Sequence, residues 1–336
     1  MSTKRSIVIG LIVIIFLCSF TITCNLFGWG DGDDDSEADD DVVDDDSGDD
    51  DIVDDDDDTP QGMALIPAGP YIMGCNEYVD SECNQDEYPQ HEVYISAFYM
   101  DIYETTNQQF ADYLNEFNHE NICDEVLNYF PCIDPADEDR SGIRNVEGTW
   151  VVDSGWENKP AVGVSWEGAR DFCNAYGLRL PTEAEWEKAA RLAKDELGNK
   201  FSFLYPWGDF WEPNRANWAH NNDPYETGVY PRTTPVGFFD GSSQDGYQTA
   251  DGRSPFGLHD MAGNVSEWVS DWYGPGYYQS SPYEDPQGPV YPLQGMEIHV
   301  QRGGIFASLD YDLRASNRFG GGDTSSSGVR CTIDFE

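Results

Sequence analysis

Basic side chains are scarce in this chain, with 18 Lys and Arg against 64 Asp and Glu among its 336 residues. The formal net charge of −46 repels phosphate backbones, so we expect no nucleic-acid partner. A Gly-rich phosphate loop is missing, and Ser165 fits a helix cap better than the nucleophile of a hydrolase. The few histidines lack the i, i+4 spacing of a helical metal pair, so we expect them to be surface or core residues with satisfied hydrogen bonds: His91, His119, His220, His259 and His299.

The N-terminal segment has the order of an export signal. Lys4 and Arg5 precede an apolar run from Ile7 to Leu17, and small residues follow up to Cys24. The apolar run falls short of the roughly 20 residues that a membrane-spanning helix needs. Residues 1–24 are therefore predicted to be a signal peptide of lipoprotein type, with a transmembrane anchor as the alternative. In the first case Cys24 carries lipid, and the exported protein is anchored to a membrane, in the periplasm or on the cell surface.

An Asp-rich segment follows over residues 25–60. Between Asp31 and Asp58 it holds eighteen Asp and one Glu and almost nothing that could be buried. Self-repulsion and the entropy cost of ordering such a chain predict a disordered tether, with calcium binding as the alternative. Residues 61–336 contain no further linker or repeat, and their aromatic content suits the core of one large domain.

Cysteines are also few, eight in all, and six of them follow the N-terminal segment: Cys75, Cys83, Cys123, Cys132, Cys173 and Cys331. An even number in an exported chain favours disulfides over free thiols. The short separations predict that Cys75–Cys83 and Cys123–Cys132 are disulfides that close short local loops. Cys173 and Cys331 are then left as a third pair.

Only three segments have helical signals. Glu104–Phe117 places apolar side chains on one face, and Thr105 or Thr106 can cap its start. Ser165 can cap a second helix, which ends before Gly177. Thr182 begins a capping box for a third helix, which runs to about Ala193.

The remaining segments are rich in Gly, Pro, Asn and Asp. They predict short strands, such as His91–Met100 and Val329–Phe335, among long loops. Ordering such loops costs conformational entropy, which disulfides and metal ions can offset. The pattern as a whole predicts an irregular α+β fold with few helices and short antiparallel strands.

Four blocks of sequence carry a family resemblance: Leu178–Glu187, Gly257–Trp268, Arg302-Gly303-Gly304 and Gly328-Val329-Arg330-Cys331. Together they resemble the formylglycine-generating enzyme family, the sulfatase-modifying factors, and the resemblance covers nearly everything after Gly62. It implies a loop-rich variant of the C-type lectin fold. It also supports the Cys173–Cys331 pair, because related domains join the helix before the first block to the C-terminal strand.

The resemblance implies two calcium sites, whose oxygen ligands suit that hard cation. Carried over position by position, the first would use two side chains and two backbone carbonyls: Asp260 and Glu267, with Gly263 and Val265. The second would use the side chains of Asn217 and Asp223 and the carbonyls of Trp218 and Tyr225, although its spacing departs from the family pattern. The alternative for the first site is that Glu267 caps a turn while Asp260 faces solvent.

The family enzymes hold copper(I) between two cysteines just after the Arg-Gly-Gly element, where this chain has Ser308 and Leu313. Serine is a hard and weak ligand and leucine is none, so we expect no copper here. Ser266 and Ile305 replace a tryptophan and a serine that line the family's oxygen pocket.

These replacements favour a domain that has lost the oxidase centre and acts as a binding or assembly module for an extended peptide, protein or glycan. The alternative is an oxidoreductase, either formylglycine-generating through an altered centre or iron-dependent, acting on an exported protein or a small thiol.

Overall fold

Hydroxyl caps decide where the α-helices begin. The computed structural model describes residues 59–117, 141–194, 197–226, 232–244, 246–295, 298–321 and 325–335. Its helices are capped by side chains that accept the N–H three residues on, from Thr106, Ser165 and Thr182. The described part holds three α-helices: α1 (Asn107–Glu116), α3 (Trp166–Ala175) and α4 (Glu183–Arg191).

Two of these helices differ from the prediction at one end. The first begins at Asn107 rather than Glu104, because Thr106 is the cap. The third ends at Arg191, because the next residues leave the helix to pair as β7 (Leu192–Lys194) with β8 (Lys200–Ser202). A capping residue is a local signal, but a strand pairing depends on a partner from elsewhere, which is why the C-terminal end was misplaced.

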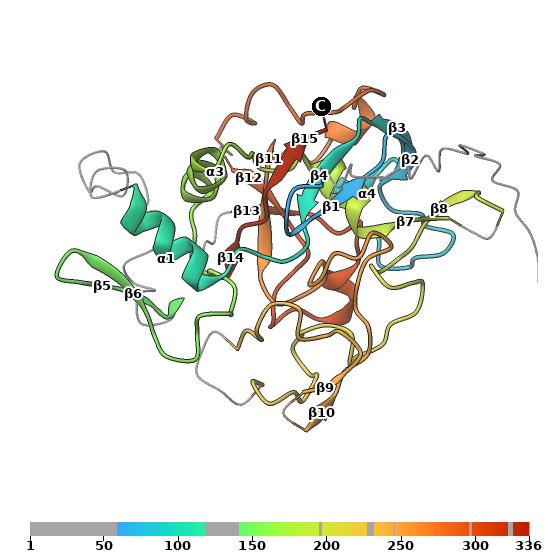
Figure 1. The fold of residues 1–336 in the computed structure, drawn as a ribbon. Helices are drawn as coiled ribbons and strands as arrows, with labels where there is room; N and C mark the ends of the chain where they lie inside the picture. The colour runs from blue at the N-terminus through green and yellow to red at the C-terminus, as the bar shows by residue number, and fades with distance from the viewer. Residues whose placement is uncertain are drawn as a thin grey trace, which may run out of the picture. The chain divides into compact units, whose positions relative to one another are not determined.

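Two sheets organise the domain (Figure 1). A three-stranded antiparallel sheet has the order β1-β4-β15, and a four-stranded sheet has the order β13-β12-β11-β14, in which only β11 and β14 run parallel. Their strands are β1 (Met63–Ile66), β4 (Phe98–Asp101), β15 (Thr332–Asp334), β11 (Ser266–Trp272), β12 (His299–Arg302), β13 (Phe319–Gly321) and β14 (Ser327–Gly328).

The remaining strands form four short antiparallel pairs. They are β2 (Gly69–Met73) with β3 (His91–Ile95), β5 (Ile143–Val146) with β6 (Thr149–Val152), β7 with β8, and β9 (Ser243–Gln244) with β10 (Tyr247–Gln248). Short 3-10 helices are η1 (Gln85–Glu87), η4 (Tyr277–Gln279) and η5 (Asp310–Leu313).

The predicted strand His91–Met100 is divided into β3 and β4. Ser96 lies at the break, where its N–H and hydroxyl both donate to the Asp285 carboxylate at 2.7 and 2.8 Å. This long-range contact redirects the chain so that β3 pairs with β2 and β4 with β1. The α+β, loop-rich fold class itself is as predicted.

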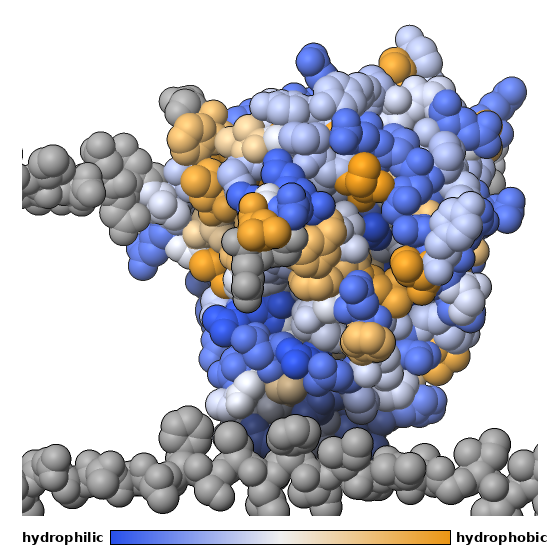
Figure 2. All heavy atoms as spheres, turned by 90° about the vertical axis from the view of Figure 1, so that its right-hand side faces the viewer, coloured by the Kyte–Doolittle hydropathy of each residue, from blue (hydrophilic) through white to orange (hydrophobic). Residues whose placement is uncertain are grey.

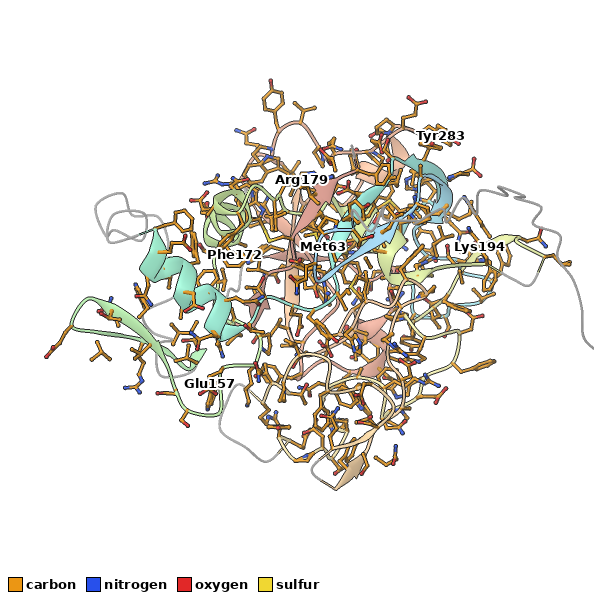
Figure 3. All side chains as sticks on the ribbon, in the orientation of Figure 1. Met63, Glu157, Phe172, Arg179, Lys194 and Tyr283 are labelled. Atoms are coloured by element: carbon orange, nitrogen blue, oxygen red, sulfur yellow. A yellow bond between two sulfur atoms is a disulfide. The ribbon has the colours of Figure 1, made fainter. Side chains whose placement is uncertain are left out.

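The core lies between the helices and the sheets. Phe172 of α3, labelled in Figure 3, stacks on Phe110 of α1 with ring centroids 5.5 Å apart, and this contact packs the two helices against each other. The Cys173–Cys331 bond joins α3 to the residue directly before β15, as predicted. The Cys75–Cys83 bond is also confirmed. Residues Asp56–Glu336 form one compact unit.

Other predictions fall outside the described residues: the Cys123–Cys132 bond, the signal peptide, the lipid on Cys24 and the Asp-rich tether. None of the helices in the described part combines the length and the apolar composition that a bilayer span requires.

Candidate functional site

A small pocket brings together three of the four residues that replace the family's oxidase centre. Ser266 at the start of β11 faces Ile305 and Ser308 from the loop after β12. The pocket has a volume of about 240 Å³ and is completed by Gln301, Gly304, Phe319, Gly320 and Ser326. Its polar groups are hydroxyls, one amide side chain and backbone, and it has no charged side chain in its lining. This chemistry suits neutral hydrogen bonding to a ligand.

The turn at Gly303 and Gly304 sets the position of Ser308. Both glycines have positive φ, at 90° and 75°, which is the conformation that residues with a Cβ rarely adopt. After the turn, the Ile305 N–H donates to Ser308 Oγ at 3.0 Å, and the Ser308 N–H donates to the Ile305 carbonyl at 2.9 Å. The Ser308 hydroxyl therefore closes a local turn at the wall of the pocket.

Leu313 lies behind this turn and does not line the pocket. It is fully buried in an apolar cluster with Tyr205, Ala216 and Ala262. A Cβ built on Gly304 would come within 2.5 Å of the Leu313 side chain, so Leu313 fills the space directly under the turn. The leucine thus acts as a packing residue at this position.

The donor set does not fit copper(I), which requires soft ligands such as thiolates. Cys75, Cys83, Cys173 and Cys331, the cysteines of the described residues, are all held in disulfides. The group Cys75, Asp80, Cys83 and Glu87 has the spacing of a metal site, but its two sulfurs are bonded to each other. Its two carboxylates instead pair with the buried Arg314, each at 2.8 Å.

A cluster of carboxylates lies on the other side of the Gly263 loop, where the first calcium site is predicted. Glu267 and Glu104 are buried, and Asp260 is partly buried. Burial raises the pKa of Glu104 well above its usual value, and the nearby Asp260 and Glu267 carboxylates raise it further. Burial raises the pKa of Asp260 as well.

Arg330 is the cation of this cluster. Its guanidinium donates to both Glu267 oxygens at 2.7 to 3.1 Å and to the carbonyls of Asp101 and His259. The indole of Trp186 also donates to Glu267, at 2.6 Å. Arg330 pairs with Glu267, while Glu104 and Asp260 have no salt bridge within the described residues, and burial raises the pKa of both, which favours the neutral form. A bound cation would stabilise their charged forms. Asp260 and Glu267 with the Gly263 and Val265 carbonyls would hold it.

Asn264, which the sequence analysis did not single out, connects the parts of this region. Its amide N–H donates to Glu104 at 2.6 Å, while its oxygen accepts from Asn217 at 3.2 Å and from the Thr234 N–H at 3.0 Å. Its own backbone carbonyl accepts from the N–H of Phe306 beside the pocket. Asn264 has φ of 59°, and the Gly-Asn pair was the available signal, since Asn tolerates that conformation.

The predicted second calcium site is built as a hydrogen-bonded turn. The Asp223 carboxylate accepts from the N–H groups of Tyr225 at 2.6 Å and Glu226 at 2.9 Å, and from the Asn221 side chain at 2.6 Å. Asn221 also donates to the carbonyl of Ala216, next to Asn217 and Trp218. Burial raises the pKa of Asp223. The Asn217 side chain donates to the Arg232 carbonyl and to the Asn264 side chain. The predicted ligands of the second calcium site therefore lie in two turns, one at Asn217 and one at Asp223, which Asn221 connects.

Comparison with known proteins supplies the context for this arrangement. The family model described as Sulfatase-modifying factor enzyme 1-like domain matches residues 49–335. The formylglycine-generating enzyme of Streptomyces coelicolor is 31% identical over 305 residues, covering 82% of this chain and 90% of the enzyme. The inactive C-alpha-formylglycine-generating enzyme 2 of Mus musculus is 26% identical over 306 residues, covering 80% and 84%.

A different kind of relative is the serine/threonine-protein kinase pkn1 of Chlamydia caviae, which is 35% identical over 274 residues. The match covers 80% of this chain but 37% of the kinase, so the chain spans little more than a third of that protein. Among solved structures, PvdO from Pseudomonas aeruginosa has the same fold, with a TM-score of 0.55 at 22% identity, covering 81% of this chain and 94% of PvdO.

Proposed function

The chain belongs to the family of sulfatase-modifying factor enzyme 1-like domains, and from that premise we propose that it is a binding module that has lost the oxidase centre. The observation that carries the proposal is the pair Ser308 and Leu313. The first closes a turn through its hydroxyl, and the second is core, so neither supplies a soft ligand for copper(I).

The lining of the pocket supports a binding role. Hydroxyls of Ser266 and Ser308 and the amide of Gln301 stand beside the apolar walls of Ile305 and Phe319. Such a mixture suits the backbone of an extended peptide or the hydroxyls of a glycan, whose neutral groups need hydrogen bonds rather than ion pairs. One relative is itself named an inactive member, so loss of activity has a precedent in the family.

Two further parts complete the proposal. The chain is exported and held to a membrane through lipid on Cys24, with residues 25–60 as a spacer that keeps the domain away from the surface. Calcium at Asp260 and Glu267 stabilises the loop behind the pocket, since the ion would favour the charged forms of carboxylates that burial otherwise disfavours.

We expect the full chain to neither bind copper(I) tightly nor consume oxygen. The measurement is an anaerobic titration with copper(I) against a chromogenic chelator, followed by oxygen uptake in the presence of a cysteine-containing peptide. The formylglycine-generating enzyme of Streptomyces coelicolor serves as the positive control. Intact mass must show that the disulfides stay closed, because reduction would release thiolates. Binding of copper(I) in stoichiometric amount, together with oxygen uptake, would contradict the proposal.

Calcium removal tests the scaffold separately. We expect EGTA to lower the midpoint of thermal unfolding by about 5 °C relative to millimolar calcium, because a ligand that binds only the native state adds about 2.7 kcal/mol at a hundredfold excess over Kd. Asp260→Ala, which removes the side-chain oxygens, should abolish this difference. The matched control is Asp240→Ala, in a surface hairpin where Asp240 bridges to Asp251. Equal calcium responses in the two variants would show that Asp260 is not a ligand.

A further inference from the structure

A second cavity lies away from the Ser266 pocket and shares no lining residue with it. Its volume is about 650 Å³, within the range of sites that enclose small molecules. It is bounded by β2, by the loop that carries the Cys75–Cys83 bond, by the end of α4 and by β8 with the segment that follows. These elements face the viewer in Figure 2, where apolar side chains gather among hydrophilic ones in the middle of the face.

Two basic side chains line this cavity. Arg191 is 4% exposed, and its Nε is buried without a hydrogen-bond partner. Its terminal nitrogens reach a carboxylate oxygen of Glu187 at 3.6 Å and the Gly74 carbonyl at 3.2 Å. Lys200 forms no ion pair with any described residue, and its Nζ lies 3.5 Å from the Pro70 carbonyl. A buried donor left unpaired costs free energy, which an acceptor from a ligand would recover.

Two carboxylates also line this cavity. Asp80 pairs with Arg314 at 2.8 Å and accepts the Glu82 N–H at 2.9 Å. Asp209 accepts the Leu204 N–H at 3.1 Å. Arg191 shares the Glu187 carboxylate with Arg302, which pairs with it at 2.6 Å, so Arg191 and Lys200 are the donors that this cavity offers to an acid group, in a chain whose net charge is −46.

The other walls are aromatic. Phe201 and Phe203 meet edge to face with centroids 5.0 Å apart, and Phe210 is 82% exposed at the rim. Exposed aromatic side chains beside a concave surface favour a ligand with an apolar group, since its burial removes both surfaces from water.

We propose that this cavity binds a small organic anion, whose acid group lies against Arg191 and Lys200 and whose apolar group lies against Phe201 and Phe210. The acid group is a carboxylate or its chemical equivalent. A free ligand fits these walls better than the chain's own Asp-rich segment, because residues 31–58 contain no aromatic side chain.

The test uses 1-anilinonaphthalene-8-sulfonate, a fluorescent aromatic anion, with the folded full chain. We expect one probe bound per chain and, for N-phenyl-1-naphthylamine, which lacks the sulfonate, binding about tenfold weaker. Lys200→Gln and Phe210→Ala should each weaken the anion's binding about fivefold. The control is Lys194→Gln, at an exposed lysine on the same hairpin that does not line the cavity (Figure 3).

Several results would overturn the proposal. If Lys200→Gln and Lys194→Gln weakened the binding of the anion equally, the hairpin would attract anions nonspecifically and the cavity would not be the site. Equal binding of the two probes would show that the cations contribute nothing. Displacement of the anion by a synthetic peptide of residues 44–58 at micromolar concentration would assign the cavity to the Asp-rich segment. Thermal unfolding of each variant confirms that these outcomes concern binding and not loss of the fold.

Discussion

Arg330→Met is expected to lower the free energy of unfolding by about 3–5 kcal/mol, because removing one partner leaves a buried carboxylate unpaired. The guanidinium is fully buried, and it is the group that neutralises Glu267. It also holds the carbonyls of Asp101 and His259, so its loss frees acceptors in β4 and in the loop before β11. Urea unfolding at neutral pH in the presence of EGTA measures the effect.

The matched control is Arg179→Met, at an arginine that also pairs with carboxylates but is partly exposed (labelled in Figure 3). Solvent screens that pair, so its loss should cost at most about 1 kcal/mol. If calcium occupies the carboxylate cluster, millimolar calcium should restore part of the stability of Arg330→Met and little of that of Arg179→Met. Similar losses in the two variants would contradict the role assigned to Arg330.

Replacing Cys173 and Cys331 together by alanine is expected to cost about 3–5 kcal/mol. The two residues are 158 positions apart, so their bond closes a long loop and removes much of the entropy of the unfolded chain. Both sulfurs lie in the apolar cluster between α1 and α3, where alanine also leaves space unfilled. Denaturant unfolding of the oxidised wild type and of the double variant gives the difference.

The Cys75–Cys83 bond provides the comparison within the same molecule. Its separation is 8 residues, for which the same entropy argument gives about 2.5 kcal/mol. The double alanine variant at these positions should therefore unfold at a higher denaturant concentration than the Cys173 and Cys331 variant. The reverse order would mean that the local pair stabilises the native loop beside Arg314 more than loop length predicts.

Part of the candidate site could be predicted from the sequence, and part of it could not. Ser266, Ile305 and Ser308 were assigned to one site by resemblance, and the fold does bring them together. Leu313 was assigned to it as well, but a residue's place before or behind a turn depends on what packs against it. Glu104 was missed because it precedes α1, 156 residues before Asp260, and only the tertiary fold makes them neighbours.

The sequence by itself determined what is encoded locally or by motif. The Ser165 and Thr182 caps, the family and its loop-rich fold class, and the local Cys75–Cys83 pair could all be predicted, because a cap, a motif or a short cysteine spacing carries its own signal. The Cys173–Cys331 pair followed by elimination, with support from the family resemblance. Only the tertiary structure decided that Glu267 pairs with Arg330 and that the cations Arg191 and Lys200 share an aromatic cavity. Such contacts join distant segments through burial and charge, and neither burial nor the distance between charges is written in the order of the residues.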